Sequence, residues 1–325
     1  MKHSQLIQLA LFFVILWPIM SLMANAQTPE MLAHFDYDKT APLGIKEIGV
    51  EKRGHVTIHD ITYGSPKGGV VPAYLVVPKG KGPFAAVVWG HWYWGSSPMR
   101  NRKEFLDEAV AIAPSGVVSL LTDGPIARPG YVSDNQPLGE KQVSYLVQQV
   151  IDMRRGVDLL TQRKDVDLNR IAYVGHSYNG VVGAILSGID KRFKAFVLMA
   201  ATMSDEVTRK IPEYQEYRKQ IGEEKFEAFE KKYYWIDQGR YVAHAAPATV
   251  FLQYASQERF LDPKWMPLYA AVVSEPKRFK LYDAPHALNA EARRDRIAFL
   301  VEQLKLKPVP ESVIVKIPEL YQPPR

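Results

Sequence analysis

The sequence contains no cysteine among its 325 residues. This absence excludes disulfide bonds, a thiolate nucleophile and cysteine-based metal sites, so stability must come from the hydrophobic core. A clustered basic stripe is also missing, because 41 Lys and Arg are scattered among 35 Asp and Glu, for a net charge of +6. A weak, scattered positive charge gives no indication of nucleic-acid binding.

The N-terminal segment has the pattern of an export signal. Lys2 precedes an apolar stretch over residues 6–23, and Ala24-Asn25-Ala26 follows. A basic start, an apolar centre and a small-x-small end predict a signal peptide over 1–26, with 27–325 as the mature chain. The alternative is an uncleaved anchor, since the stretch approaches membrane-spanning length. The cleaved form would be periplasmic or secreted from a bacterium, without stable membrane insertion.

The mature chain alternates strand and helix patterns. Apolar segments without alternation are typical of strands buried on both faces of a parallel sheet. Helical patterns at 141–162 and 291–304 lie between or after them. We therefore predict one α/β domain with a mostly parallel central sheet flanked by helices. Its strands are expected at 85–89, 117–121, 171–174, 196–199, 249–252 and 278–282, with antiparallel edge strands at 56–63 and 70–77.

Residues 203–244 form a long, charged and aromatic stretch that interrupts the alternation of strands and helices. We predict a helical cap inserted between two strands and closing over the site. The alternative is a surface excursion without function, but long insertions in compact domains are often functional.

Ser177 lies where a strand pattern turns sharply into a helix pattern. A serine on such an elbow has a strained backbone that exposes its hydroxyl, and the next backbone N–H faces the developing oxyanion. Gly175 meets the need for a small residue two positions earlier, whereas Asn179 replaces the usual glycine two positions later. Asparagine tolerates unusual backbone angles, so Ser177 is the predicted nucleophile.

His286 is the predicted base, because it follows the last expected strand and precedes the C-terminal helix. The acid should follow the preceding strand, where two carboxylates are available. Glu258 is favoured because it lies just past the strand end. Asp262 is the rival, although it also suits a helix N-cap before Pro263.

The loop after residue 89 is rich in aromatic residues. The second oxyanion donor is expected here, from the N–H of Trp92 or Tyr93, with the first from Tyr178. Aromatic side chains also suit an apolar or sugar substrate. The residues predicted to bind substrate are Trp94, Tyr233, Tyr234 and Trp235.

The other histidines and one aspartate have simpler interpretations. His91 and His176 are expected to be structural, since His286 fills the base position. His55 and His59 lie along a predicted strand, where four residues span about 13 Å, so they cannot share a metal. Asp123 suits a turn before Gly-Pro. No metal site and no cofactor are predicted.

The assembled residues resemble the dienelactone hydrolase and acetyl xylan esterase-like branch of the α/β-hydrolase superfamily, over about residues 50–305. The resemblance lies in the segments 152–160 and 167–170, in Gly175-His176-Ser177 and in 282–287. It implies an α/β-hydrolase fold with a Ser-His-acid triad.

The elbow also resembles that of glucuronoyl esterases. The sequence differs from the dienelactone hydrolase branch at two positions of the expected triad. No cysteine nucleophile exists, so dienelactone hydrolysis is not implied, and Glu258 replaces the usual aspartate.

These features favour a serine hydrolase that cleaves small-molecule or carbohydrate esters through an acyl-enzyme. Two alternatives stay open. One is a compact serine peptidase of the prolyl oligopeptidase kind, and the other is a catalytically silent relative that binds a ligand.

Overall fold

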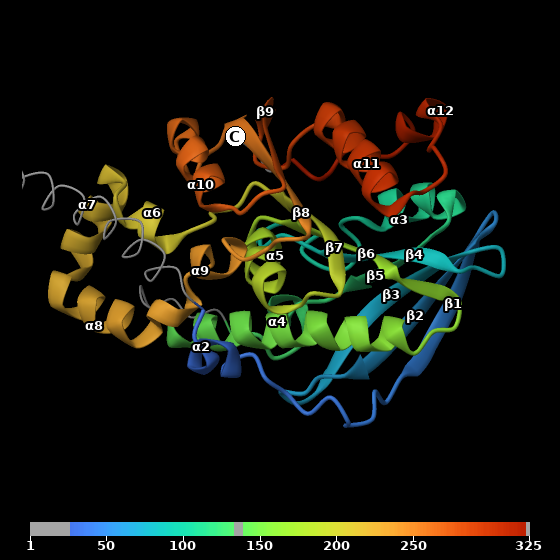
Figure 1. Ribbon diagram of the computed structural model, residues 1–325, viewed down its shortest axis with the longest axis horizontal. Coiled ribbons are helices and arrows are strands. Elements are labelled where there is room, and N and C mark those ends of the chain that lie inside the picture. Colours follow the sequence, from blue (N-terminus) through green and yellow to red (C-terminus); the bar gives the residue numbers. More distant parts are fainter. Residues whose placement is uncertain (1–26, 133–138, 323–325) are drawn as a thin grey trace, which may run out of the picture.

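The computed structural model describes residues 27–132 and 139–322, which contain a nine-stranded sheet of order β1-β2-β3-β5-β4-β6-β7-β8-β9 (Figure 1). Strands β1, β2 and β3 pair antiparallel with their neighbours, and the remaining pairs are parallel. The predicted mostly parallel sheet is therefore confirmed. The strands are β1 (Lys46–Arg53), β2 (Val56–Gly64), β3 (Val70–Pro78), β4 (Phe84–Gly90), β5 (Val117–Thr122), β6 (Val166–His176), β7 (Phe193–Met199), β8 (Thr249–Gln257) and β9 (Lys277–Pro285).

Helices cover both faces of the sheet, with α4 on one side and α3 and α11 on the other (Figure 1). The α-helices are α2 (Pro29–Ala33), α3 (Leu106–Ile112), α4 (Glu140–Thr161), α5 (Tyr178–Ile189), α6 (Asp205–Arg209), α7 (Pro212–Ile221), α8 (Glu223–Tyr233), α9 (Gly239–Val242), α10 (Met266–Val272), α11 (Ala290–Leu304) and α12 (Glu311–Ile314).

The central strands are buried on both faces, which explains their unalternating apolar sequence. In β4, Val88 packs in the hydrophobic cluster that includes residues of α4 and α5. Its neighbour Val87 packs in the opposite cluster, with residues of α3 and α11. Because successive side chains of a strand face opposite sides, both must be apolar here.

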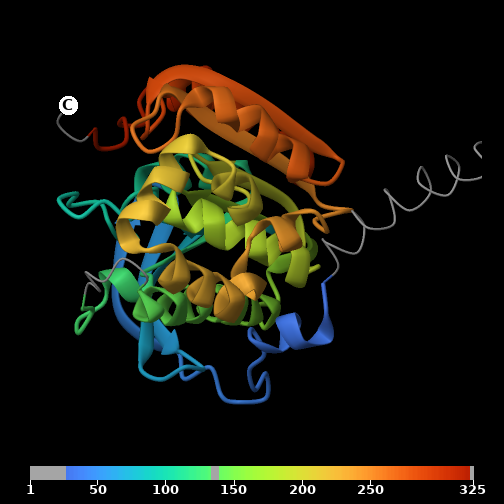
Figure 2. The ribbon, with the colours of Figure 1, turned by 90° about the vertical axis from the view of Figure 1, so that its left-hand side faces the viewer.

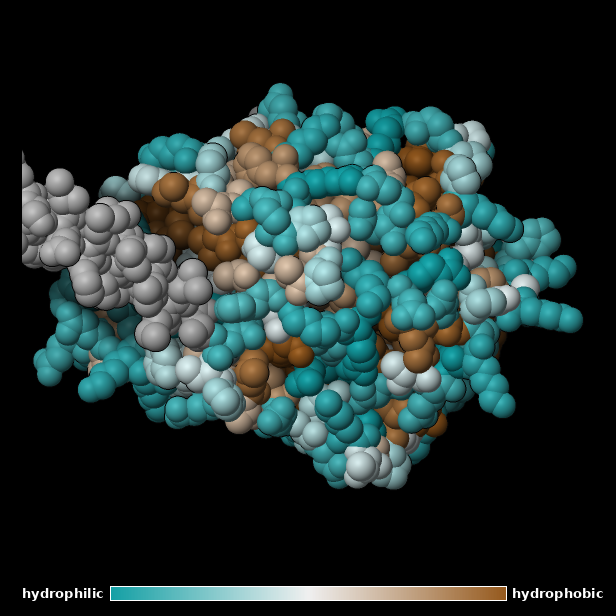
Figure 3. Space-filling view, in the orientation of Figure 1, coloured by the Kyte–Doolittle hydropathy of each residue, from teal (hydrophilic) through white to brown (hydrophobic). Residues whose placement is uncertain are grey.

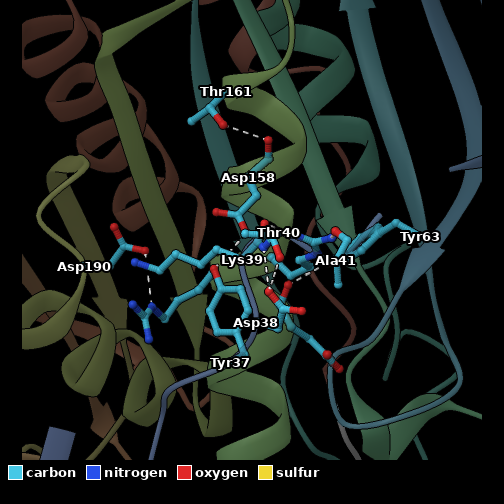
Figure 4. Close-up of polar contacts among 12 residues, drawn as sticks. Tyr37, Asp38, Lys39, Thr40, Ala41, Tyr63, Asp158, Thr161 and Asp190 are labelled. Carbon is cyan, nitrogen blue, oxygen red and sulfur yellow. Dashed lines mark hydrogen bonds and ion pairs between the residues drawn. The ribbon is translucent and has the colours of Figure 1, made fainter. Parts of the chain in front are cut away.

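The segment before the sheet is held against α4 by polar contacts (Figure 4). Tyr37 donates a hydrogen bond of 2.8 Å to Asp158, and burial followed by this carboxylate raises the pKa of Tyr37 to about 12. Arg192 bonds the same Asp158 at 2.6 Å and also pairs with Asp190. Because polar contacts hold this segment, its sequence shows no hydrophobic periodicity from which a strand or a helix could be predicted.

The predicted insertion is helical and contains α6, α7, α8, α9 and the short 3-10 helix at Tyr234–Ile236. It leaves the sheet at the carboxyl end of β7. Helices α6, α7 and α8 form a group at one end of the molecule, on the left in Figure 1 and facing the viewer in Figure 2. Lys232 of α8 forms an ion pair of 2.7 Å with Glu140 of α4. A lid function for this insertion remains a prediction.

The surface is mainly polar on the face seen in Figure 3, where hydrophilic residues surround smaller hydrophobic patches. Among residues 27–132 and 139–322, no helix is both long and apolar enough to cross a membrane. The segment predicted as a signal peptide, 1–26, lies outside the described residues.

A carboxylate pair in the insertion predicts a pH effect on stability. Asp237 accepts N–H bonds from Asp205 and Glu206 at 2.9 and 3.2 Å, at the start of α6. Burial and the nearby Asp237 carboxylate raise the pKa of Asp205 to about 7. The folded protein therefore retains a proton on Asp205 that the unfolded chain loses near pH 4.

Folding stability contributed by Asp205 should consequently fall as pH rises from about 4 to about 7. The variant Asp205→Asn lacks this titration. We expect its melting temperature, relative to the parent, to increase steadily across that range. A difference that is constant with pH would contradict the assignment.

Candidate active site

Ser177 occupies the turn between β6 and α5, as predicted. Its φ of 54° and ψ of −112° lie in the strained left-handed half of backbone space. Its N–H donates to the Met199 carbonyl of β7 at 2.7 Å, which holds the turn against the sheet. A side chain at Gly175 would overlap the Asn179 backbone, so only glycine fits there. The strand, turn and helix thus lift the Ser177 hydroxyl at the end of β6.

Asn179, which replaces the usual glycine of the elbow, has a structural explanation. Its buried side chain donates to the His91 carbonyl and accepts a bond of 3.1 Å from Gln149. Gly90 lies against it, and a Cβ at position 90 would come within 2.5 Å of the Asn179 Cβ. The Asn179 side chain therefore links the elbow to the loop after β4 by a hydrogen bond.

The structure brings Ser177, His286 and Glu258 together. His286 Nε2 lies 2.9 Å from Ser177 Oγ, and His286 Nδ1 lies 2.6 Å from Glu258 Oε2. The side chains of His286 and Glu258 are only 6% and 4% exposed. A hydrogen on Nδ1 bonds the carboxylate, so the Nε2 lone pair faces the serine hydroxyl.

Glu258 follows β8 and is held as an ionised acceptor. Burial raises the pKa of its carboxyl, but the bond to His286 and the backbone N–H groups of Arg259 and Phe260 outweigh burial and lower the pKa overall. Those N–H groups lie 2.8 and 3.3 Å from Oε1. Asp262 instead accepts a bond of 3.0 Å from the Lys264 N–H as the cap of a short helix. It is Glu258, and not Asp262, that contacts His286.

The oxyanion prediction needs one correction. The Trp92 N–H donates to Glu104 Oε2 at 2.6 Å, so this donor is already occupied and its assignment to the oxyanion was wrong. Tyr178 is the first residue of α5, where an N–H has no partner within the helix. Tyr93 follows Trp92 in the same loop, and its hydroxyl lies 3.2 Å from that of Tyr131. The roles of Tyr178 and Tyr93 remain predictions.

Two aromatic side chains lie beside His286. The Trp94 ring centroid is 6.3 Å from that of His286, and the Phe260 centroid is 5.1 Å away. Trp94 and Phe260 also contact each other at 5.6 Å. Sequence reasoning missed Phe260, although an aromatic residue two positions after the acid was a usable signal. Phe260 is 68% exposed, so it offers an open apolar surface.

The predicted substrate contacts from the insertion are not brought to this site. Trp235 is buried and stacks on His34 at 3.6 Å, beside α2, so its assignment to substrate was wrong. Tyr233 packs on Phe229 at 4.8 Å, and Tyr234 lies under the Arg240 guanidinium at 5.5 Å.

His91 is buried in a neutral form. It bonds the Trp92 carbonyl through Nδ1 at 2.8 Å and accepts the Gly124 N–H on Nε2 at 2.9 Å. Burial lowers its pKa to about 4, which agrees with the neutral ring. Asp123 accepts the Arg102 N–H at 2.7 Å in the adjoining turn. Both residues have the structural roles predicted for them.

His59 lies on β2 and pairs with Glu47 at 2.7 Å. In the part of the chain that the structure describes, no three His, Asp or Glu side chains are grouped to hold a metal ion.

A serine on a strained elbow, a histidine after β9 and a carboxylate after β8 are arranged as in α/β-hydrolases. Comparison with solved structures confirms the α/β-hydrolase fold. An acetyl xylan esterase from Paenibacillus sp. R4 has a TM-score of 0.66 and 18% identity, over 85% of this chain and 92% of that one.

Acetyl xylan esterase 1 from Thermoanaerobacterium sp. JW/SL YS485 has a TM-score of 0.67 and 16% identity, over 86% and 95% of the two chains. A glucuronoyl esterase from Solibacter usitatus has a TM-score of 0.57 and 16% identity, over 85% and 91%. No protein-family model matches the sequence, and no curated protein matches it.

Proposed function

We propose that this chain is an exported serine hydrolase that cleaves carboxylic esters. The observation that carries the proposal is the pair of hydrogen bonds on opposite nitrogens of His286, at 2.9 Å to Ser177 and 2.6 Å to Glu258. This order of contacts suits proton transfer from a serine to a histidine whose tautomer a carboxylate holds.

In the proposed reaction, Ser177 Oγ bonds to the acyl carbon while its proton passes to His286 Nε2. Glu258 stabilises the imidazolium, and the N–H groups of Tyr178 and Tyr93 are the proposed oxyanion donors. The ester C–O bond then breaks, and the alcohol leaves with the proton from Nε2. Water hydrolyses the acyl-enzyme by the same proton path in reverse. No cofactor is needed for these steps.

We assign the substrate to the class of carbohydrate or other ring-bearing esters. Trp94 and Phe260 supply aromatic surface beside His286, and such surface packs well on sugar and aromatic rings. The names of the similar structures, acetyl xylan esterase and glucuronoyl esterase, agree with this class.

Hydrolysis of acetylated xylan oligosaccharides, methyl glucuronate esters, phenyl acetate and a set of peptide amides tests the proposal. We expect ester turnover and no peptide cleavage. Faster peptide cleavage would favour the compact peptidase, and no turnover of any substrate would favour a silent binding protein.

The aromatic pair predicts a selective loss of affinity. Replacing Trp94 and Phe260 with alanine should raise KM for phenyl acetate or a sugar acetate about tenfold, while methyl acetate is little affected. The control is Tyr234→Ala, which removes an exposed aromatic ring that contacts Arg240 and not His286. An equal change for small and ring-bearing esters would contradict the substrate assignment.

A further inference from the structure

A buried carboxylate and a buried histidine lie behind the proposed site and take no part in the reaction described above. Glu104 lies in the turn before α3, and His176 is the last residue of β6, directly before Ser177. Their side chains are 1% and 0% exposed, and Glu104 Oε1 lies 2.5 Å from His176 Nδ1.

The two residues join three loops of the site. The second oxygen of Glu104 accepts the Trp92 N–H at 2.6 Å, in the loop after β4. The second ring nitrogen of His176 lies 3.1 Å from the His286 carbonyl, in the loop after β9. A continuous path therefore runs from the loop that contains Tyr93, through the elbow of Ser177, to the backbone of His286.

Ring contacts reinforce this path. The His176 ring stacks on Trp92 at 5.1 Å with an interplanar angle of 15°. It also lies 5.3 Å from the His286 ring, which Trp92 in turn faces at 6.2 Å. Any displacement of His176 would therefore shift both the ring and the backbone of His286.

The hydrogen-bond pattern determines which residue types can occupy these positions. The His286 carbonyl only accepts, so Nε2 of His176 must donate, and the contact between Nδ1 and Glu104 needs a second hydrogen. Both carboxylate oxygens of Glu104 are used as acceptors. A glutamine oxygen can still accept the Trp92 N–H while its NH₂ group donates to Nδ1 of a neutral His176 ring, so glutamine can keep both contacts, whereas methionine, of similar length, can make neither.

We propose that Glu104 and His176 form a positioning pair that sets the distance between the oxyanion loop, Ser177 and His286. This inference rests on the proposed function. The pair does not touch the substrate and exchanges no proton with it. Its effect is geometric, because displacement of reacting groups by about 1 Å is enough to lower turnover about 10²-fold.

The test is the variant Glu104→Met, whose side chain has a similar length but makes neither hydrogen bond, beside the conservative Glu104→Gln, which should stay near the parent kcat. In Glu104→Met we expect kcat for phenyl acetate to fall about 10²-fold while KM stays near the parent value, since the aromatic surface at Trp94 and Phe260 is retained. The matched control is Glu108→Gln in α3, which breaks a buried bond of 2.8 Å to Arg296. That variant should lose stability and keep the parent kcat.

A folded Glu104→Met protein with the parent kcat would overturn the inference. Equal losses of kcat in Glu104→Met and Glu108→Gln would also overturn it, because the effect would then follow stability alone.

If Glu104→Met does not fold, nitrogen-edited proton NMR of the parent protein decides. We expect a slowly exchanging hydrogen in each of the two His176 contacts, and a ring with only one such hydrogen would contradict the pair. Absence of all ester turnover in the parent would instead refute the proposed function, while the NMR result would still report on the pair.

Discussion

Replacing Ser177 with alanine is expected to lower kcat for ester hydrolysis by about 10⁴-fold or more. The change removes the oxygen that attacks the acyl carbon, and His286 and Glu258 cannot replace it. Folding should be unaffected, because alanine keeps the Cβ that serine already places at a φ of 54°. Steady-state kinetics and a thermal melt of the same preparation measure both effects.

The matched control is Ser187→Ala, a buried serine of α5 whose hydroxyl bonds the Ala184 carbonyl at 2.7 Å. It should keep parent turnover despite a small loss of stability. Ester turnover that survives in Ser177→Ala at the parent rate would remove Ser177 as the nucleophile.

The second large effect is expected from Glu258→Gln, with a loss of about 10⁴-fold in kcat. A neutral amide no longer stabilises the imidazolium at His286. Its NH₂ group also favours the tautomer with hydrogen on Nε2, which cannot accept the Ser177 proton. The backbone N–H groups of Arg259 and Phe260 can still bond the amide oxygen, so the loop should keep its shape.

Asp262→Asn is the control for this experiment. Asp262 caps a short helix and pairs with Lys264 on the surface, and asparagine caps helices equally well. We expect parent kinetics. If Asp262→Asn were inactive and Glu258→Gln active, the acid would have been assigned to the wrong carboxylate, with the serine and histidine assignments unaffected.

The parallel strands and the elbow were predictable because each has a strong local signal. A strand buried on both faces must be apolar throughout, as β4 is, and a serine between a strand and a helix with Gly175 nearby has few alternative interpretations. Strand β1 was missed because it lies at the sheet edge with most side chains exposed, so its sequence carries no hydrophobic period.

The positions of aromatic residues in the insertion were not predictable in the same way. Trp235 is an aromatic residue of the kind that often contacts a substrate, but in the fold it stacks on His34, about 200 residues earlier in the chain. The bond between Glu104 and Trp92 also depends on tertiary packing, so no local pattern showed that this N–H was occupied. Contacts with residues far along the chain determine where such a side chain lies, and the hydrophobic periodicity of the local sequence does not reveal those contacts.

The most direct test of the central claim is labelling with a fluorophosphonate, followed by mass spectrometry of the digested protein. The reagent bonds to a serine that a histidine activates, so it reports the proposed chemistry without knowledge of the natural ester. We predict one adduct, on the peptide that contains Ser177, and none in Ser177→Ala. An unlabelled parent protein, or an adduct on another serine, would contradict the account.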